Sequence, residues 1–129
     1  PMQNNQVTYE FAVIRVVPKV EREEFLNVGV IVFSKRKKYL SMKYHIDEQR
    51  LKSFSPTLDI ELIENYLKGW NLICQGGRSG GRIGAAEMPY RFRWLTADKS
   101  TMLQSSRPHA GLCEAPEKIL EYLFERYVL

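Results

Sequence analysis

Cysteine and histidine are scarce in this chain, since each occurs only twice in 129 residues. Cys74 and Cys113 are far apart in the sequence and form no Cys-x-x-Cys pair. That spacing excludes a disulfide framework and a four-cysteine zinc site. We therefore expect two reduced thiols, no bound metal and a cytoplasmic protein, with Cys113 a small buried residue just before the last helix.

Long hydrophobic runs are also absent. The longest, Val28–Phe33, is about a third of the ~20 residues that a membrane-spanning helix needs. The N-terminus lacks the charged start, apolar stretch and small-residue cleavage site of a signal peptide. We expect neither a membrane span nor export, and we interpret Pro1 before Met2 as a cloning remnant outside the fold.

No strong charge of one sign is present, because 19 basic residues face 15 acidic ones and leave a net charge of +4. That balance permits phosphate-bearing or nucleic-acid partners but does not indicate them. Apolar residues make up 44% of the chain, which is enough for one hydrophobic core. We expect a single globular domain over residues 3–129.

The first half of the sequence predicts a strand and then a hairpin. Residues 9–17 are β-branched and aromatic on both faces, which is typical of a central strand that Pro18 ends. Residues 28–33 and 39–46 form a hairpin with residues 35–38 at its tip, and Leu40, Met42, Tyr44 and Ile46 face inward.

Helices are predicted at two main places. Asp47 caps a short helix, and Ser55-Pro56 starts a longer one whose inner stripe is Ile60, Ile63, Tyr66, Leu67 and Trp70. Pro116 opens a C-terminal helix with an inner stripe of Ile119, Leu120, Leu123 and Tyr127.

Between these helices the pattern changes twice. Residues 76–84 hold five of the eight glycines, so we expect no regular structure there and a mobile loop over residues 76–86. Residues 90–95 alternate aromatic and arginine, which predicts a strand with Phe92 and Trp94 facing the core. The fold class expected is α+β, with a mainly antiparallel sheet of four to five strands packed against two main helices.

The polar stretch 91–113 is the main candidate site. If Arg91 and Arg93 share a sheet face with Lys43 and His45, they form a basic surface suited to an acidic partner or an anionic ligand. We expect Arg93 to be held by neighbours rather than free. The binding residues expected are Arg91, Arg93, Ser100, Thr101, Gln104 and His109.

Two basic segments are weaker candidates for contact with phosphate or nucleic acid. Lys35, Arg36, Lys37 and Lys38 form the tip of the predicted hairpin, where a solvated turn is the simpler interpretation. Arg78 and Arg82 lie in the glycine-rich segment, which lacks the lysine and hydroxyl residue of a P-loop.

No catalytic or metal-binding motif is present. His109 and Cys113 are four residues apart, but Pro108 and Gly111 argue against a helix that would bring them together. We expect no cofactor, no metal and no catalytic residue. An enzyme acting on a phosphate-containing substrate, with His109 as acid or base and arginines as clamp, remains an alternative.

Two segments, residues 9–33 and 91–128, resemble the bacterial domain-of-unknown-function family 3037. The resemblance is carried by Arg15, Pro18, Glu24-Phe25, residues 27–30, residues 92–96, Ser100-Thr101, Gln104, His109, residues 111–113 and Leu123-Phe124. The family has no assigned activity. Its members are often encoded beside HipA-like kinases, so the resemblance implies an accessory or partner role.

The function expected is therefore a non-enzymatic binding or accessory module with a protein partner, such as a HipA-like kinase. Enzymatic action on a phosphate-containing substrate and nucleic-acid binding are the two alternatives.

Overall fold

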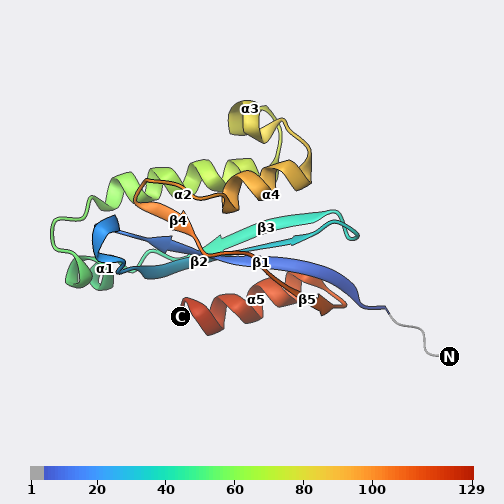
Figure 1. Ribbon diagram of the computed structural model, residues 1–129, viewed down its shortest axis with the longest axis horizontal. Helices are drawn as coiled ribbons and strands as arrows, with labels where there is room; N and C mark the ends of the chain where they lie inside the picture. The colour runs from blue at the N-terminus through green and yellow to red at the C-terminus, as the bar shows by residue number, and fades with distance from the viewer. Residues whose placement is uncertain (1–4) are drawn as a thin grey trace.

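A five-stranded antiparallel sheet forms the centre of the computed structural model, which describes residues 5–129 (Figure 1). The strands are β1 (Val7–Val16), β2 (Leu26–Ser34), β3 (Tyr39–Tyr44), β4 (Leu103–Ser105) and β5 (His109–Cys113). Their order is β3-β2-β1-β4, and β5 also pairs with β1. The α+β class and the antiparallel sheet are confirmed. Pro1 and Met2, interpreted as a cloning remnant and native start, lie outside the described residues.

Residues 5–129 also form five α-helices and two short 3-10 helices. The α-helices are α1 (Glu48–Phe54), α2 (Ile60–Gln75), α3 (Gly81–Gly84), α4 (Met88–Thr96) and α5 (Pro116–Tyr127). The 3-10 helices are η1 (Val20–Arg22) and η2 (Arg78–Gly80). The expected pair of main helices is thus not confirmed as such. None of the helices in residues 5–129 is long and apolar enough to cross a bilayer.

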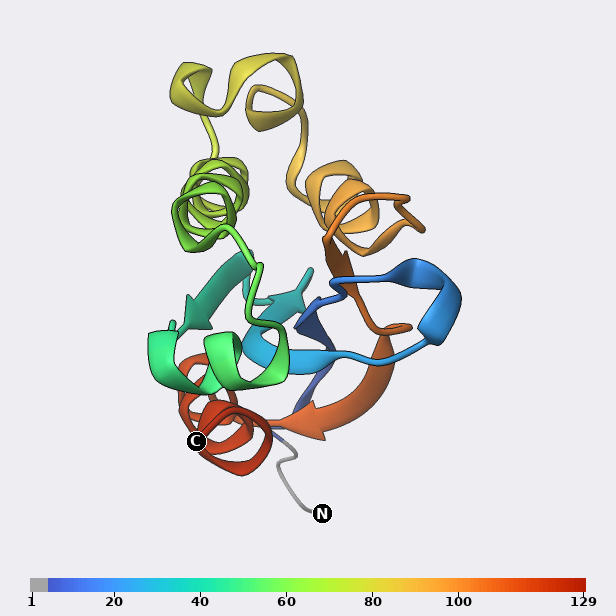
Figure 2. The same ribbon diagram turned by 90° about the vertical axis from the view of Figure 1, so that its left-hand side faces the viewer.

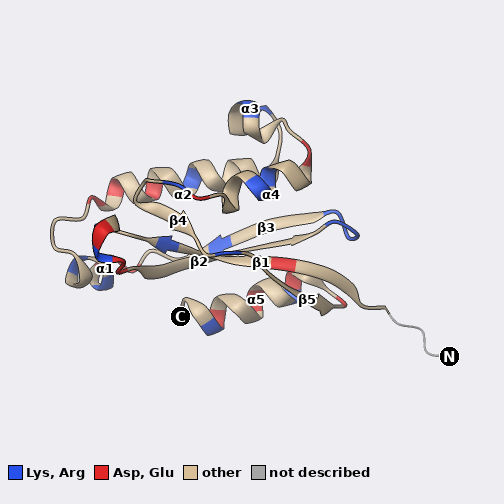
Figure 3. Cartoon of the chain, viewed as in Figure 1, with Lys and Arg blue, Asp and Glu red and all other residues tan. Residues whose placement is uncertain are grey.

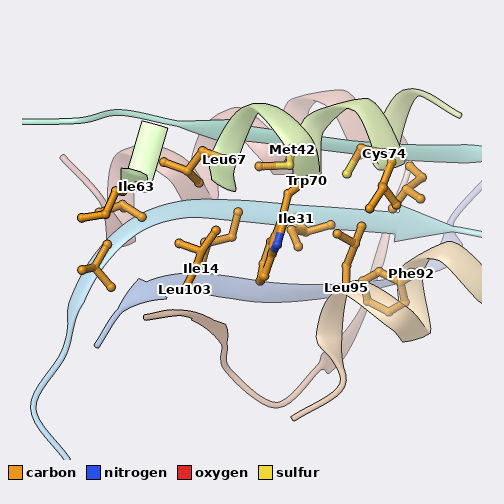
Figure 4. Packing of buried hydrophobic residues seen from close by; sticks show 14 of the residues in the cluster. Ile14, Ile31, Met42, Ile63, Leu67, Trp70, Cys74, Phe92, Leu95 and Leu103 are labelled. Atoms are coloured by element: carbon orange, nitrogen blue, oxygen red, sulfur yellow. The ribbon is translucent and has the colours of Figure 1, made fainter. Parts of the chain in front are cut away.

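The sheet separates two hydrophobic clusters. Helices α2 and α4 stand side by side over one face, and α5 covers the other (Figure 2). The larger cluster joins Ile14 and Ile31 of the sheet to Trp70 of α2 and Phe92 of α4 (Figure 4). The smaller one joins Val30 and Val32 to residues of α5. Both faces of β2 are therefore packed, as the unbroken apolar run of residues 28–33 predicts.

The edge of β1 opposite β2 is shared by two short strands. β4 pairs with residues 14–16 of β1, and β5 pairs with residues 7–11. Ser106 lies at the break between them. Its buried hydroxyl accepts a hydrogen bond from the Val13 N–H at 2.8 Å, and its own N–H donates to the Val13 carbonyl at 2.8 Å. The Ser106 side chain thus replaces a ladder partner that the interrupted edge does not supply.

The start of α2 corrects the predicted helix cap. The helix begins after Asp59, whose carboxylate accepts from the Leu62 N–H at 3.1 Å, and not at Ser55-Pro56. The cap of α1 was predicted correctly, because Asp47 accepts from the Arg50 N–H at 3.1 Å. An aspartate three residues before a free helical N–H satisfies it better than the Ser-Pro pair further upstream.

The glycine-rich segment corrects a second expectation. It forms η2 and α3 instead of irregular structure, and the Gly77 N–H donates to the Gly84 carbonyl at 2.7 Å. Gly84 is buried, and a Cβ on it would lie 2.7 Å from the Gly77 carbonyl oxygen. The glycines here permit close backbone packing rather than prevent structure. Mobility over residues 76–86 stays a prediction.

The largest error concerns residues 90–95, which form part of helix α4 and not a strand. Pro89 stands in the first turn, and the buried positions Arg91, Phe92 and Leu95 follow helical spacing. Tyr90 is half exposed, so it does not share the buried position of Phe92. Six alternating residues were too few to separate a strand from a helix.

Candidate functional site

The most promising site is a groove of about 560 Å³ on the side of the sheet that α2 and α4 cover. Its walls come from α2, η2, the end of α4 and β4, so it lies between segments that are distant in the sequence. The lining residues are Asn65, Tyr66, Gly69, Trp70, Leu72, Ile73, Ser79, Gly80, Trp94, Ala97, Asp98, Lys99, Thr101 and Leu103.

Two tryptophans give the groove its aromatic wall. Trp70 reaches down from α2 and passes between Leu103 and Leu95, which leaves the residue only 6% exposed (Figure 4). Trp94 lies at the end of α4 and is half-buried. These are the chain's only two tryptophans, so both indoles report on the same place in the molecule.

Lys99 is fixed between the two indoles. Its Nζ lies 4.4 Å from the centroid of the Trp94 ring and 5.2 Å from that of Trp70. The ammonium donates to the carbonyl oxygens of Trp94, Leu95 and Ala97. An ammonium has three N–H bonds, so three carbonyls and two π faces occupy it fully. Lys99 therefore closes the C-terminal end of α4 and supplies the groove with a held positive charge.

Burial sets the acidity of this lysine. Desolvation lowers the pKa of Lys99 to about 8, and the charge of Asp98 acts weakly in the opposite direction. The three carbonyl acceptors also favour the ammonium form, so the charged amine predominates near neutrality. With every N–H engaged, Lys99 has no free donor for a ligand phosphate, and it does not offer a free amine as a nucleophile.

The rim of the groove exposes apolar surface. Tyr66 and Leu72 of α2 are 37% and 38% exposed. Tyr66 was predicted to lie in the core stripe of α2, and the structure corrects this, because its side chain turns to the groove and not to the sheet. Isolated exposed apolar residues are common, but these two flank one concave surface.

Arg91, predicted as a binding residue, has a structural role. It is 8% exposed and donates from one terminal nitrogen to the carbonyl oxygens of Ile73 and Cys74 at 2.9 and 2.8 Å. Its Nε donates to the Ala86 carbonyl at 3.0 Å. These carbonyls lie at the end of α2 and in the turn before α4, so Arg91 ties the two helices together.

Arg93 was expected to be held, and it is not. It is exposed, and its guanidinium has no hydrogen-bond or ion-pair partner within residues 5–129. It precedes Trp94, a lining residue of the groove, in the sequence of α4. The strand interpretation had placed it opposite the core, whereas the helical geometry turns it to solvent.

The expected basic sheet surface does not form. Lys43 lies under α5, where it pairs with Glu121 and sits 5.0 Å from the Phe124 ring centroid. His45 is exposed beyond the end of β3. Arg91 and Arg93 belong to a helix on the opposite face of the sheet, so these four residues do not share a surface.

The remaining predicted binding residues divide between the two faces. Thr101 lines the groove, and Ser100 is the exposed residue just before it. Gln104 and His109 lie away from the groove. The His109 ring is 5.3 Å from Phe11, which packs against the cluster under α5. His109 therefore lies in strand β5 with its ring toward the α5 side of the sheet, whereas Arg93 belongs to α4 on the other side.

The basic segments stay at the surface as two separate groups. Lys35, Arg36, Lys37 and Lys38 are exposed at the β2–β3 tip, the blue end of the hairpin in Figure 3. Arg78 and Arg82 are exposed on η2 and α3. Only Arg78 is a neighbour in sequence of a groove residue, Ser79.

Metal ligation has no support in the described part of the chain. No group of three histidine, cysteine, aspartate or glutamate side chains could hold an ion there. Cys74 and Cys113 are free and buried, and burial raises the pKa of Cys74 to about 12. A thiol with that pKa stays protonated and unreactive. The predicted burial of Cys113 is confirmed.

Sequence reasoning missed Trp94 and Lys99 as site residues. Trp94 was placed in the core by the incorrect strand, and Lys99 was not considered because a single lysine carries no motif. The available signal was a helical spacing, since Tyr90 and Trp94 are four residues apart and would share a helix face.

Comparison with known proteins gives one family. The sequence model described as "Protein of unknown function (DUF3037)" matches residues 11–128. Neither the curated proteins nor the solved structures contain a significant match to the chain.

Proposed function

The chain belongs to the DUF3037 family, whose function is unknown, and from that premise we propose that it is a binding module that docks an apolar segment of a partner protein in the groove between α2 and α4. The observation that carries the proposal is the aromatic groove itself, in which the one lysine has all its donors engaged and the rim exposes Tyr66 and Leu72.

The chemistry of the lining favours an apolar ligand. Binding a phosphate requires free N–H or O–H donors, and the groove offers few, since Lys99 is fully engaged and the Thr101 hydroxyl donates to the Leu103 carbonyl at 3.0 Å. Trp70 is too buried to serve as a stacking platform for a nucleobase. One or two apolar side chains of a peptide would instead bury the exposed faces of Tyr66, Leu72 and Trp94.

The positive charges beside the groove indicate which kind of partner segment would bind. Arg78 and Arg93 are exposed next to the groove residues Ser79 and Trp94, and neither is paired within the described chain. Carboxylates flanking the apolar segment of a partner would meet these two cations. The partner segment proposed is therefore apolar with acidic residues beside it, and Arg93 takes part as a rim residue rather than as a structural one.

A HipA-like kinase in the same cytoplasm is the partner that the family resemblance implies, and it enters here as part of the proposal. The two free thiols are compatible with a reducing compartment. The alternatives remain proposals with less support. Acid–base catalysis by His109 with Arg93 as clamp would require the two to meet, and nucleic-acid binding would rest on two separate basic groups.

Intrinsic fluorescence tests the docking, because both tryptophans lie in the groove. The purified kinase and display-selected peptides with an apolar centre and acidic flanks are titrated against the protein. We expect a saturable change in tryptophan emission. Leu72→Asp should weaken binding by about tenfold or more, since it places a carboxylate on the apolar rim.

Tyr122→Asp is the matched control, since Tyr122 is 57% exposed on α5, on the other side of the sheet. This variant should bind as the unaltered protein does. If a partner binds without any change in tryptophan emission and with equal affinity to Leu72→Asp, the groove is not its docking site.

A further inference from the structure

Arg15 stands at the surface on the face of the sheet opposite the groove. Its neighbours on β1, Ile14 and Val16, belong to the cluster under α2 and α4, so the Arg15 side chain projects from the other face. There its guanidinium carbon lies 4.0 Å from the centroid of the Phe25 ring. Phe25 is 44% exposed, so the guanidinium rests on an aromatic ring that is itself open to solvent.

Apart from its contact with Phe25, this guanidinium has no hydrogen-bond or ion-pair partner in residues 5–129. Its Nε is buried and makes no hydrogen bond, and the same holds for the Oδ1 of Asn27 on the neighbouring strand. The two terminal nitrogens of Arg15 are accessible to solvent. The carboxylate nearest to Phe25 in sequence, Glu24, pairs with Arg22 at 3.0 Å and does not neutralise Arg15. Water therefore satisfies the terminal nitrogens, and a ligand that displaces this water can accept their hydrogen bonds.

Two amide side chains flank Arg15 in the sheet. Asn27 of β2 and Gln104 of β4 are its cross-strand partners, so the three side chains form a row on one face. Asn27 donates to the Tyr127 carbonyl at 3.2 Å, and Gln104 donates to the Thr101 carbonyl at 2.9 Å. Because backbone carbonyls hold both amides, the row is rigid and the guanidinium is its charged member.

Partial burial lowers the cost of binding a ligand to this guanidinium. Desolvation lowers the pKa of Arg15 below its ordinary value, although an arginine stays protonated at neutral pH. A guanidinium that has already lost part of its hydration, and that Phe25 holds in place, loses less on binding than a free surface arginine does.

Neighbouring glutamates favour an anion with a single negative charge over one with two. Glu21, Glu23 and Glu24 are exposed in the link before Phe25, and their negative charges oppose a dianionic phosphate. A carboxylate carries one charge, and its two oxygens match the planar fork of two terminal nitrogens. We propose that Arg15, resting on Phe25 between Asn27 and Gln104, is a binding site for a carboxylate group, supplied by a small organic acid or by an acidic side chain of a protein.

The site is tested on the unaltered protein by following the ¹⁵N–¹H signal of the Arg15 Nε during titration with sodium acetate, against sodium chloride at equal ionic strength. We expect a saturable shift with a Kd in the millimolar range, as for a single charge-assisted contact. Inorganic phosphate should bind more weakly than acetate because of the neighbouring glutamates.

A second arm identifies the source of the carboxylate. A blocked peptide with one glutamate between apolar residues that binds about tenfold or more tighter than acetate indicates an acidic side chain of a protein, and equal affinities indicate a small acid. The same peptide with glutamine in place of the glutamate should not shift the signal. In Arg15→Gln, checked for folding by its melting curve, acetate should produce no saturable change at the Asn27 and Gln104 side-chain amides.

Arg107→Gln provides the matched control, since Arg107 is exposed in the link between β4 and β5 and belongs to neither site. It should leave the Arg15 response unchanged. The proposal is overturned if chloride gives the same shift as acetate, if the signal does not saturate, or if the Arg107 Nε responds as strongly as the Arg15 Nε. None of these outcomes depends on whether the groove between α2 and α4 docks a partner.

Discussion

Arg91 donates to the carbonyl oxygen of Cys74 at 2.8 Å and so joins α4 to the last turn of α2. That turn contains no basic residue of its own that could interact with its free carbonyls. The contact is made by a side chain 17 positions further along the chain. One arginine therefore helps to determine where α2 ends and how α4 lies beside it.

Arg91→Met should destabilise the protein by about 3 kcal/mol, because it leaves buried carbonyls of α2 without a donor. Chemical denaturation monitored by circular dichroism measures the change in the free energy of unfolding. Arg93→Met is the matched control on the same helix. Since Arg93 is exposed and unpartnered, that variant should change stability by less than about 0.5 kcal/mol.

Gly76→Ala should destabilise the protein by about 1 to 3 kcal/mol. Gly76 has φ +83°, and an added Cβ would lie 3.0 Å from the Arg91 guanidinium carbon. Gly69→Ala is the control, because its Cβ would meet nothing within 4 Å in the middle of α2. A double variant with Arg91→Met should lose less than the sum of the single losses, since the steric conflict is then removed.

Ser106→Ala should cost about 1 to 3 kcal/mol, because the Val13 N–H inside the sheet loses its acceptor. Hydrogen exchange should show faster exchange at Val13 than at neighbouring amides of β1. Ser100→Ala serves as control, since Ser100 is exposed. Equal protection of Val13 in both variants would contradict the role assigned to the Ser106 hydroxyl.

The lowered pKa of Lys99 should make the stability of the protein depend on pH. Its pKa is lowered from 10.5 to about 8 in the fold, so between these values the unfolded chain binds more protons than the native state. The free energy of unfolding should therefore gain a contribution as pH rises from about 8 to 10.5, and this contribution should be absent below about 8.

Lys99→Met isolates this effect from other titrating groups. The difference in stability between the unaltered protein and the variant should change across that pH range and be constant below it. The side-chain carbon signals of Lys99 give its pKa directly. A midpoint near 10.5 would contradict the assigned burial of the ammonium.

How well each helix or strand could be predicted depended on the length of its hydrophobic pattern in the sequence. The unbroken apolar sequence of β2, the alternation over β3 and the helical stripes of α2 and α5 each extend over enough residues to identify the element. The short strands β4 and β5 have three and five residues, and they are strands because they pair with β1. Their own sequences carry no comparable signal.

The candidate site was less predictable than the fold, because it depends on contacts between distant segments. Lys99 is a groove residue because its ammonium contacts a backbone carbonyl at the end of α4, the Trp94 ring of α4 and the Trp70 ring of α2. These contacts join segments that are distant in the sequence. Arg15 was recognised as a residue of the family pattern. The sequence did not show that Arg15 lacks an ion-pair partner, because this depends on Glu24 pairing with Arg22 instead.

Local periodicity and residue types were enough to predict an α+β domain with an antiparallel sheet, free thiols and the pattern of the DUF3037 family. Contacts between distant segments were needed to show that residues 88–96 form a helix, that Arg91 is buried and that Arg93 is exposed. Six alternating residues suit either a strand or a helix, and the carbonyls at the end of α2 favour the helix because they accept hydrogen bonds from Arg91.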